Sequence, residues 1–125
     1  MESLDLSKIH HRIGNLFPWY GNAGEQEQYK LSKEQVEHFE EFGYVAGIKL
    51  LDADQISVLL HELDELSDMH HPGNNLFYEF STNESTDPAK VLFHALGAWR
   101  VTPGFHDVLW NPRFLIPSSQ LLGNK

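Results

Sequence analysis

Residues 31–66, LSKEQVEHFEEFGYVAGIKLLDADQISVLLHELDEL, predict two helices joined by one short strand. Each helix begins with a capping box, in which the first and fourth side chains each bond the other residue's backbone N–H. The capping pairs are Ser32 with Gln35 and Asp52 with Gln55. Gly43 suits a left-handed cap, so the first helix should end there. The second helix has an apolar stripe wide enough to bury, made of Ile56, Leu59, Leu60, Leu63 and Leu66.

The segment Tyr44–Ile48 between these helices is the predicted strand, because tyrosine, valine and isoleucine favour a pleated, buried setting. A single buried strand leaves N–H and C=O groups without partners, at a cost of about 1–3 kcal/mol for each group. Two partners are open to it. It could pair with a weaker strand candidate, Leu76–Phe80, or with strands of a longer protein that follow Lys125.

The remaining elements are also expected to be helical, which makes the chain mainly α. Pro88 at a first helical position predicts a third helix whose apolar face extends to Trp99. One or two helical turns should follow over Phe105–Trp110. Asn111 should then open a last helix, which Pro117 is expected to kink or split.

Composition limits the classes of partner and the compartment. The formal net charge is −9, with 18 Asp and Glu against 9 Lys and Arg, which argues against nucleic acid and anionic membranes. Without cysteine, disulfides and thiolate sites are excluded. No apolar stretch reaches the roughly 20 residues of a membrane helix, and the N-terminus lacks a secretory signal, so we expect a cytoplasmic protein.

The sequence divides into two parts. Residues 1–30 are predicted to form a poorly packed N-terminal arm, ahead of a helical domain over residues 31–125.

Four short motifs occur one after another along residues 31–123. The pattern L-T/S-x-E-Q-x-x-x-F-x-x-x-G-Y/F-V/L lies over residues 31–45. The later matches are Leu50, Leu51 and Ile56, then Lys90 and Val91, then Leu121, Leu122 and Gly123. In order and spacing, residues 31–123 resemble the N-terminal part of the phytanoyl-CoA dioxygenase family. Residues 1–30 have no counterpart in that family.

The resemblance implies a double-stranded β-helix (jelly-roll) oxygenase that uses Fe(II) and 2-oxoglutarate to hydroxylate a small organic substrate. The helices would buttress the barrel, and Tyr44–Ile48 would join its larger sheet. In the family, a His-x-Asp pair and a later histidine hold iron, and no His-x-Asp occurs in this sequence. We therefore expect an N-terminal fragment of an α+β enzyme, truncated before the iron site and inactive alone, whose missing partner is the C-terminal barrel.

Lys90 is the one residue that the resemblance marks as cofactor-binding. It matches, by position, a lysine that opens a helical segment and contacts the 2-oxoglutarate carboxylates in the family. An ammonium beside a dianion is physically reasonable. The alternative interpretation is an ordinary exposed helix lysine.

The eight histidines have spacings that do not predict a metal site. Neighbouring histidines point in different directions on a helix or strand, which applies to the pairs at 10–11 and 70–71. His61 and Glu65 are four residues apart on a helix and lack a third ligand, so a surface pair is expected. No catalytic or metal-ligating residue is therefore predicted in this chain.

Two other functions stay open. The first is a stand-alone acidic helical interaction module without catalysis, suggested by the acidic helices and by the aromatic residues Trp19, Tyr20, Trp99 and Trp110. The second is a small histidine-based metal protein, which would require stoichiometric metal in the purified chain.

Overall fold

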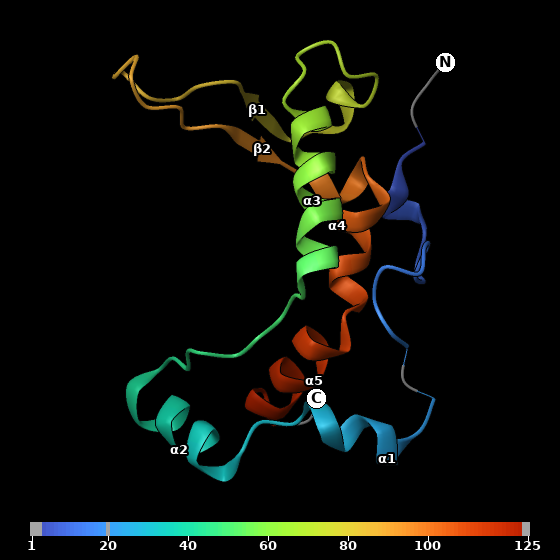
Figure 1. Ribbon diagram of the computed structural model, residues 1–125, viewed down its shortest axis with the longest axis vertical. Helices are drawn as coiled ribbons and strands as arrows, with labels where there is room; N and C mark the ends of the chain where they lie inside the picture. The colour runs from blue at the N-terminus through green and yellow to red at the C-terminus, as the bar shows by residue number, and fades with distance from the viewer. Residues whose placement is uncertain (1–3, 20, 124–125) are drawn as a thin grey trace.

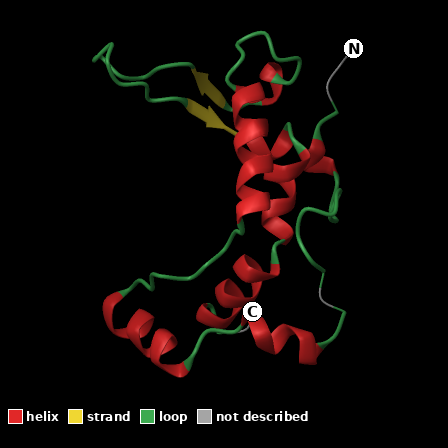
Figure 2. Cartoon of the chain, in the orientation of Figure 1, coloured by secondary structure: helices red, strands yellow, loops and turns green. Residues whose placement is uncertain are grey.

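The computed structural model describes residues 4–19 and 21–123, and this part of the chain is mainly helical with one two-stranded sheet (Figures 1 and 2). The α-helices are α1 Ala23–Gln26, α2 Lys33–Phe42, α3 Ala53–Leu66, α4 Pro103–Asp107 and α5 Pro112–Leu121. The strands are β1 Glu79–Ser81 and β2 His94–Leu96. Short 3-10 turns lie at Leu6–Lys8, Glu27–Tyr29, Asn74–Leu76, Ala98–Arg100 and Val108–Trp110.

The capping predictions for α2 and α3 are confirmed. In α2 the Gln35 N–H donates to Ser32 Oγ at 3.2 Å, and the Ser32 N–H donates to Gln35 Oε1 at 2.9 Å. Asp52 and Gln55 make the same reciprocal pair at the start of α3, at 2.8 and 2.9 Å. Gly43 ends α2 with φ of 78°, the left-handed conformation that favours glycine.

Helices α3 and α4 lie side by side at the centre of the molecule (Figure 1). The Glu62 carboxylate of α3 accepts hydrogen bonds from the backbone N–H groups of Gly104 at 2.8 Å and Phe105 at 3.1 Å. These groups belong to the first turn of α4 and have no partner within their own helix. Leu59 and Leu66 of α3 are buried on the same face. The α3–α4 contact therefore combines apolar packing with a charged cap.

Only two of the five residues in the predicted apolar stripe of α3 are buried, which corrects that prediction. Ile56, Leu60 and Leu63 are 44%, 59% and 37% exposed. Their spacing of four and three residues places them on one face of the helix, adjacent to the buried face of Leu59 and Leu66. In the described part of the chain, these three residues thus form one continuous apolar row on α3 that is exposed to solvent.

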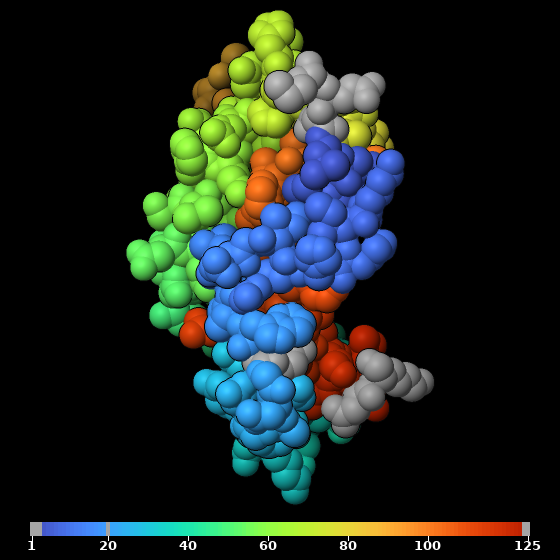
Figure 3. Space-filling model, turned by 90° about the vertical axis from the view of Figure 1, so that its right-hand side faces the viewer, coloured from blue at the N-terminus to red at the C-terminus, as the bar shows by residue number. Residues whose placement is uncertain are grey.

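The N-terminal arm is better packed than predicted over the part of it that lies against α4. Phe17 is completely buried and Leu6 nearly so. Figure 3 shows this arm, in blue, lying over the orange segment that contains α4. Before α1, the described residues of the arm are irregular except for the turn at Leu6–Lys8, and hydrogen bonds from their backbone to the Asp107 side chain of α4 hold them in place. Such long-range bonds leave no local sequence pattern.

The predicted strand Tyr44–Ile48 does not form a strand. Residues 44–50, which we call the linker segment, connect α2 to α3 as an extended chain. Within the described residues, its backbone groups make no backbone–backbone hydrogen bond. Gly47 has φ of 79°, which interrupts a regular strand conformation. At its end, Leu50 O accepts from Asn111 Nδ2 at 2.9 Å, which ties the linker segment to the cap of α5.

The predicted strand Leu76–Phe80 is partly correct. Its first residue ends a 3-10 turn, and its last two form β1 together with Ser81. The partner is β2, antiparallel, with Phe80 opposite Ala95. The linker segment is not part of this sheet.

The helix predicted from Pro88 to Trp99 is wrong, because this region forms a turn and then β2. The Asn83 side chain accepts from the backbone of Leu92 at 2.9 Å, and the Asp87 side chain accepts from Ala89 at 3.0 Å. These short polar side chains compete with helical hydrogen bonds and favour a turn.

The C-terminal predictions are mostly confirmed. Phe105–Trp110 is helical as part of α4 and the following 3-10 turn, and Asn111 caps α5. Pro117 does not split the helix, since α5 runs through it, and the kink that was the other predicted effect stays a prediction.

Candidate functional site

Lys90, the predicted cofactor-binding residue, lies in the loop that joins β1 to β2, which extends away from the helices (Figure 1). Its backbone N–H donates to Asp87 O at 3.0 Å, which closes a turn instead of opening a helix. Its ammonium lies 3.7 Å from Asp87 Oδ2, and the side chain is 80% exposed. The ammonium is therefore accessible to an anionic ligand, and its role in binding 2-oxoglutarate stays a prediction.

The histidines do not assemble an iron site in the part of the chain that the structure describes. Among residues 4–19 and 21–123, no group of three or more His, Asp or Glu side chains is placed to hold a metal ion. His61 and Glu65 form an exposed pair at 3.6 Å, and His94 pairs with Glu79 across the sheet at 3.0 Å. These residues do not fit Fe(II), which needs three protein ligands on one face.

A buried polar cluster that the sequence analysis missed centres on Asp107. Its carboxylate accepts from the backbone N–H of Ile13 at 2.8 Å and of Gly14 at 2.7 Å. His106 Nδ1 lies 2.9 Å from the same carboxylate, and its Nε2 lies 2.9 Å from Ile9 O. A carbonyl or carboxylate oxygen only accepts, so each of these two contacts is a hydrogen bond when the ring nitrogen concerned carries a proton. Only 1% of either residue is exposed.

A second long-range pair fixes the beginning of the arm. Arg100 donates from Nη2 and Nε to the two carboxylate oxygens of Asp5, at 2.7 and 3.2 Å. It also donates to Leu76 O at 2.8 Å and lies over the Tyr78 ring, 4.7 Å from its centre. Hydrogen bonding from Arg100 and Ser7 holds the pKa of Asp5 well below its usual range. These two clusters are structural, since each satisfies its polar groups internally.

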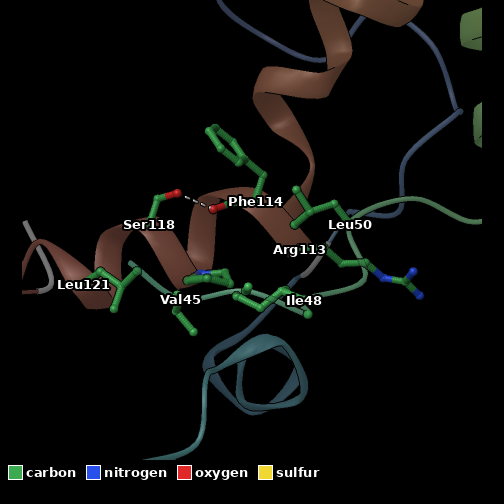
Figure 4. A pocket seen from close by; sticks show the side chains of 10 residues that line it. Val45, Ile48, Leu50, Arg113, Phe114, Ser118 and Leu121 are labelled. Atoms are coloured by element: carbon green, nitrogen blue, oxygen red, sulfur yellow. Dashed lines mark hydrogen bonds between the residues drawn. The ribbon is translucent and has the colours of Figure 1, made fainter. Parts of the chain in front are cut away.

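An apolar groove runs between the linker segment and α5 (Figure 4). Its volume is about 240 Å³. The residues that line it are Val45, Ala46, Gly47, Ile48, Leu50, Arg113, Phe114, Pro117, Ser118 and Leu121. Among the described residues, those that line the groove include no carboxylate and no histidine, so they offer apolar contact rather than general acid–base chemistry.

In comparisons with known proteins, no family model matches this sequence and no curated protein matches it significantly. No helix in the described residues is long and apolar enough to cross a membrane.

Proposed function

We propose that this chain is the N-terminal helical part of a non-haem Fe(II)- and 2-oxoglutarate-dependent dioxygenase of the cytoplasm, similar to the phytanoyl-CoA dioxygenase family. In this proposal the chain is a scaffold for a β-barrel, and the barrel carries the iron ligands. The described residues do not fit iron themselves, so no catalytic step is assigned to them.

The linker segment is the observation that carries the proposal. It is extended, its backbone lacks backbone partners among the described residues, and Tyr44 and Leu50 are exposed. An exposed run of N–H and C=O groups is a template for pairing with another strand. A neighbouring sheet would satisfy those groups and cover the groove at the same time.

The open apolar row of α3 supports the same proposal. Ile56, Leu60 and Leu63 are far more exposed than the buried side of that helix. Burying a leucine or isoleucine side chain is worth about 1.5–3 kcal/mol. A barrel packed against α3 would gain that free energy, and water would be excluded from the row.

The experiment compares two proteins from the same reading frame. One is the 125-residue chain, and the other is extended through any downstream sequence that encodes a His-x-Asp. With Fe(II) and 2-oxoglutarate, the longer protein should form succinate and the 125-residue chain should not. Sustained succinate formation by the shorter chain alone, or none by the longer one, would contradict the proposal.

Lys90 gives a residue-level test in the longer protein. Lys90→Ala should raise KM for 2-oxoglutarate by about tenfold, since it removes a charge-assisted hydrogen bond. The matched control is Lys33→Ala, which removes an exposed lysine paired with Glu37 at 3.5 Å on α2. Equal KM values in the two variants would remove Lys90 from the cofactor site.

The alternative is a stand-alone acidic interaction module. It is favoured by the exposure of large apolar side chains such as Trp19 and Phe42 in a chain of net charge −9. A natural stop codon after Lys125 would support this alternative and exclude the fragment.

A further inference from the structure

We propose that a small cleft beside the apolar groove binds an oxyanion, that is, a phosphate or carboxylate group. The cleft has a volume of about 200 Å³. Its lining residues are Gln28, Tyr29, Ile48, Lys49 and Arg113. They come from the 3-10 turn Glu27–Tyr29, from the linker segment and from the first turn of α5.

Side-chain hydrogen bonds tie the three walls of the cleft together. Gln120 of α5 accepts from the Leu31 N–H at 2.8 Å and donates to Leu31 O at 3.1 Å, which holds the chain against α5 two residues after the 3-10 turn. Asn111, the cap of α5, donates to Leu50 O at 2.9 Å and so holds the end of the linker segment. The cleft is therefore a feature of the packed structure rather than of one loop.

The charge of the cleft is opposite to that of the chain. Lys49 and Arg113 both line it, and no Asp or Glu of the described ranges 4–19 and 21–123 does, although acidic residues outnumber basic ones by 18 to 9. Within the described residues, neither cation makes an ion pair. The lysines and arginine that do are Lys30, Lys33, Lys90 and Arg100. Two uncompensated cations in one concavity raise the local concentration of anions.

The polar groups of the cleft define the class of ligand. Figure 4 shows the Arg113 side chain extending away from Val45 and Leu121 of the apolar groove. Its planar guanidinium matches the two oxygens of a carboxylate or phosphate, and an ammonium adds a point charge. Tyr29 and Gln28 can each donate a further neutral hydrogen bond. The cleft thus offers both charge and donors to a small oxyanion.

The test is a titration of the ¹⁵N-labelled 125-residue chain with inorganic phosphate and, separately, with malonate, at constant ionic strength set with sodium chloride. Saturable shifts of the Tyr29, Lys49 and Arg113 amides are expected with at least one of the two anions, and the two arms distinguish phosphate from carboxylate. Arg113→Gln and Lys49→Gln should each weaken binding by about tenfold, while the control Lys33→Gln should leave it unchanged. The spectra themselves report whether each variant is folded.

Two results would overturn the assignment. One is the absence of saturable shifts with either anion once ionic strength is constant. The other is equal affinity in wild type and a folded Arg113→Gln variant. The outcome is independent of the dioxygenase proposal, because it concerns neither Lys90 nor any iron ligand.

Discussion

Asp107→Asn tests the buried cluster that joins the N-terminal arm to α4. The wild-type carboxylate receives three donors, from Ile13 N, Gly14 N and His106 Nδ1. Asparagine has almost the same shape, but it offers one acceptor oxygen and an NH₂ group that only donates. One backbone N–H of the arm must then face another N–H, in a site where residue 107 is 1% exposed.

The expected loss follows from these contacts. A buried donor without a partner costs about 1–3 kcal/mol. Removing one charge of a buried pair costs about 3–5 kcal/mol when the other charge stays. A His106 ring that accepts at Nδ1 from the new NH₂ group removes part of that second cost. We therefore expect a loss of about 3 kcal/mol in the free energy of unfolding.

Urea denaturation followed by tryptophan fluorescence measures this loss. With an m-value of about 1.5 kcal/mol/M, the midpoint should fall by about 2 M. Asp64→Asn is the control, because it removes the same charge from an exposed position of α3. Hydrogen exchange at the Ile13 and Gly14 amides should accelerate only in the Asp107 variant. If the two variants unfold within about 0.5 kcal/mol of each other, the cluster does not hold the arm.

Three further substitutions test other contacts. Glu62→Gln should destabilise the chain by about 1–2 kcal/mol in urea, because α4 loses its charged cap; an unchanged midpoint would contradict that role. Asp5→Asn should remove an acid-sensitive contribution: since the folded pKa of Asp5 is lowered, its pair with Arg100 stabilises above the unfolded pKa near 4 and is lost as pH falls below it. Thermal unfolding of wild type and variant should therefore converge towards pH 2. Gly43→Ala should cost about 1 kcal/mol through its positive φ alone, since a Cβ there meets no atom within 4 Å; equal stability would show that α2 ends differently in solution.

The parts of the fold that the sequence predicts well are those decided within a few residues. A capping box needs only the residues at its first and fourth positions, so Ser32 and Asp52 mark the starts of α2 and α3 correctly. Gly43 likewise marks a helix end because only the local conformation matters there. These signals hold whatever the rest of the chain does.

The errors arise where a local preference competes with another or with distant residues. Apolar residues before Trp99 have helical spacing, but the Asn83 and Asp87 side chains bind the backbone and turn the chain into a hairpin. The arm contacts α4 through Asp107, which lies 93 residues after Gly14. No periodicity in either segment encodes a contact at that separation.

The two candidate sites also differ in whether the sequence alone can identify them. Lys90 is predicted from its position in a family pattern, and its exposed side chain does not depend on packing for access to solvent. The cleft of Lys49 and Arg113 joins residues that are far apart in the chain, so only the folded arrangement reveals it. A chain with a large excess of acidic residues gives no compositional hint of an anion site.

The linker segment links the fold to the proposed function through a balance of free energies. Valine and isoleucine at 45 and 48 favour a strand. An extended segment without a neighbouring strand makes no inter-strand hydrogen bonds, so it does not form a stable strand alone. Its exposed backbone is tolerated because water can satisfy the N–H and C=O groups. A partner sheet would replace water as the hydrogen-bond partner of those groups, with little net gain in free energy. It would also bury the apolar groove on α5. Burial of the apolar surface, rather than backbone hydrogen bonding, is therefore what would drive a β-barrel to dock on this segment.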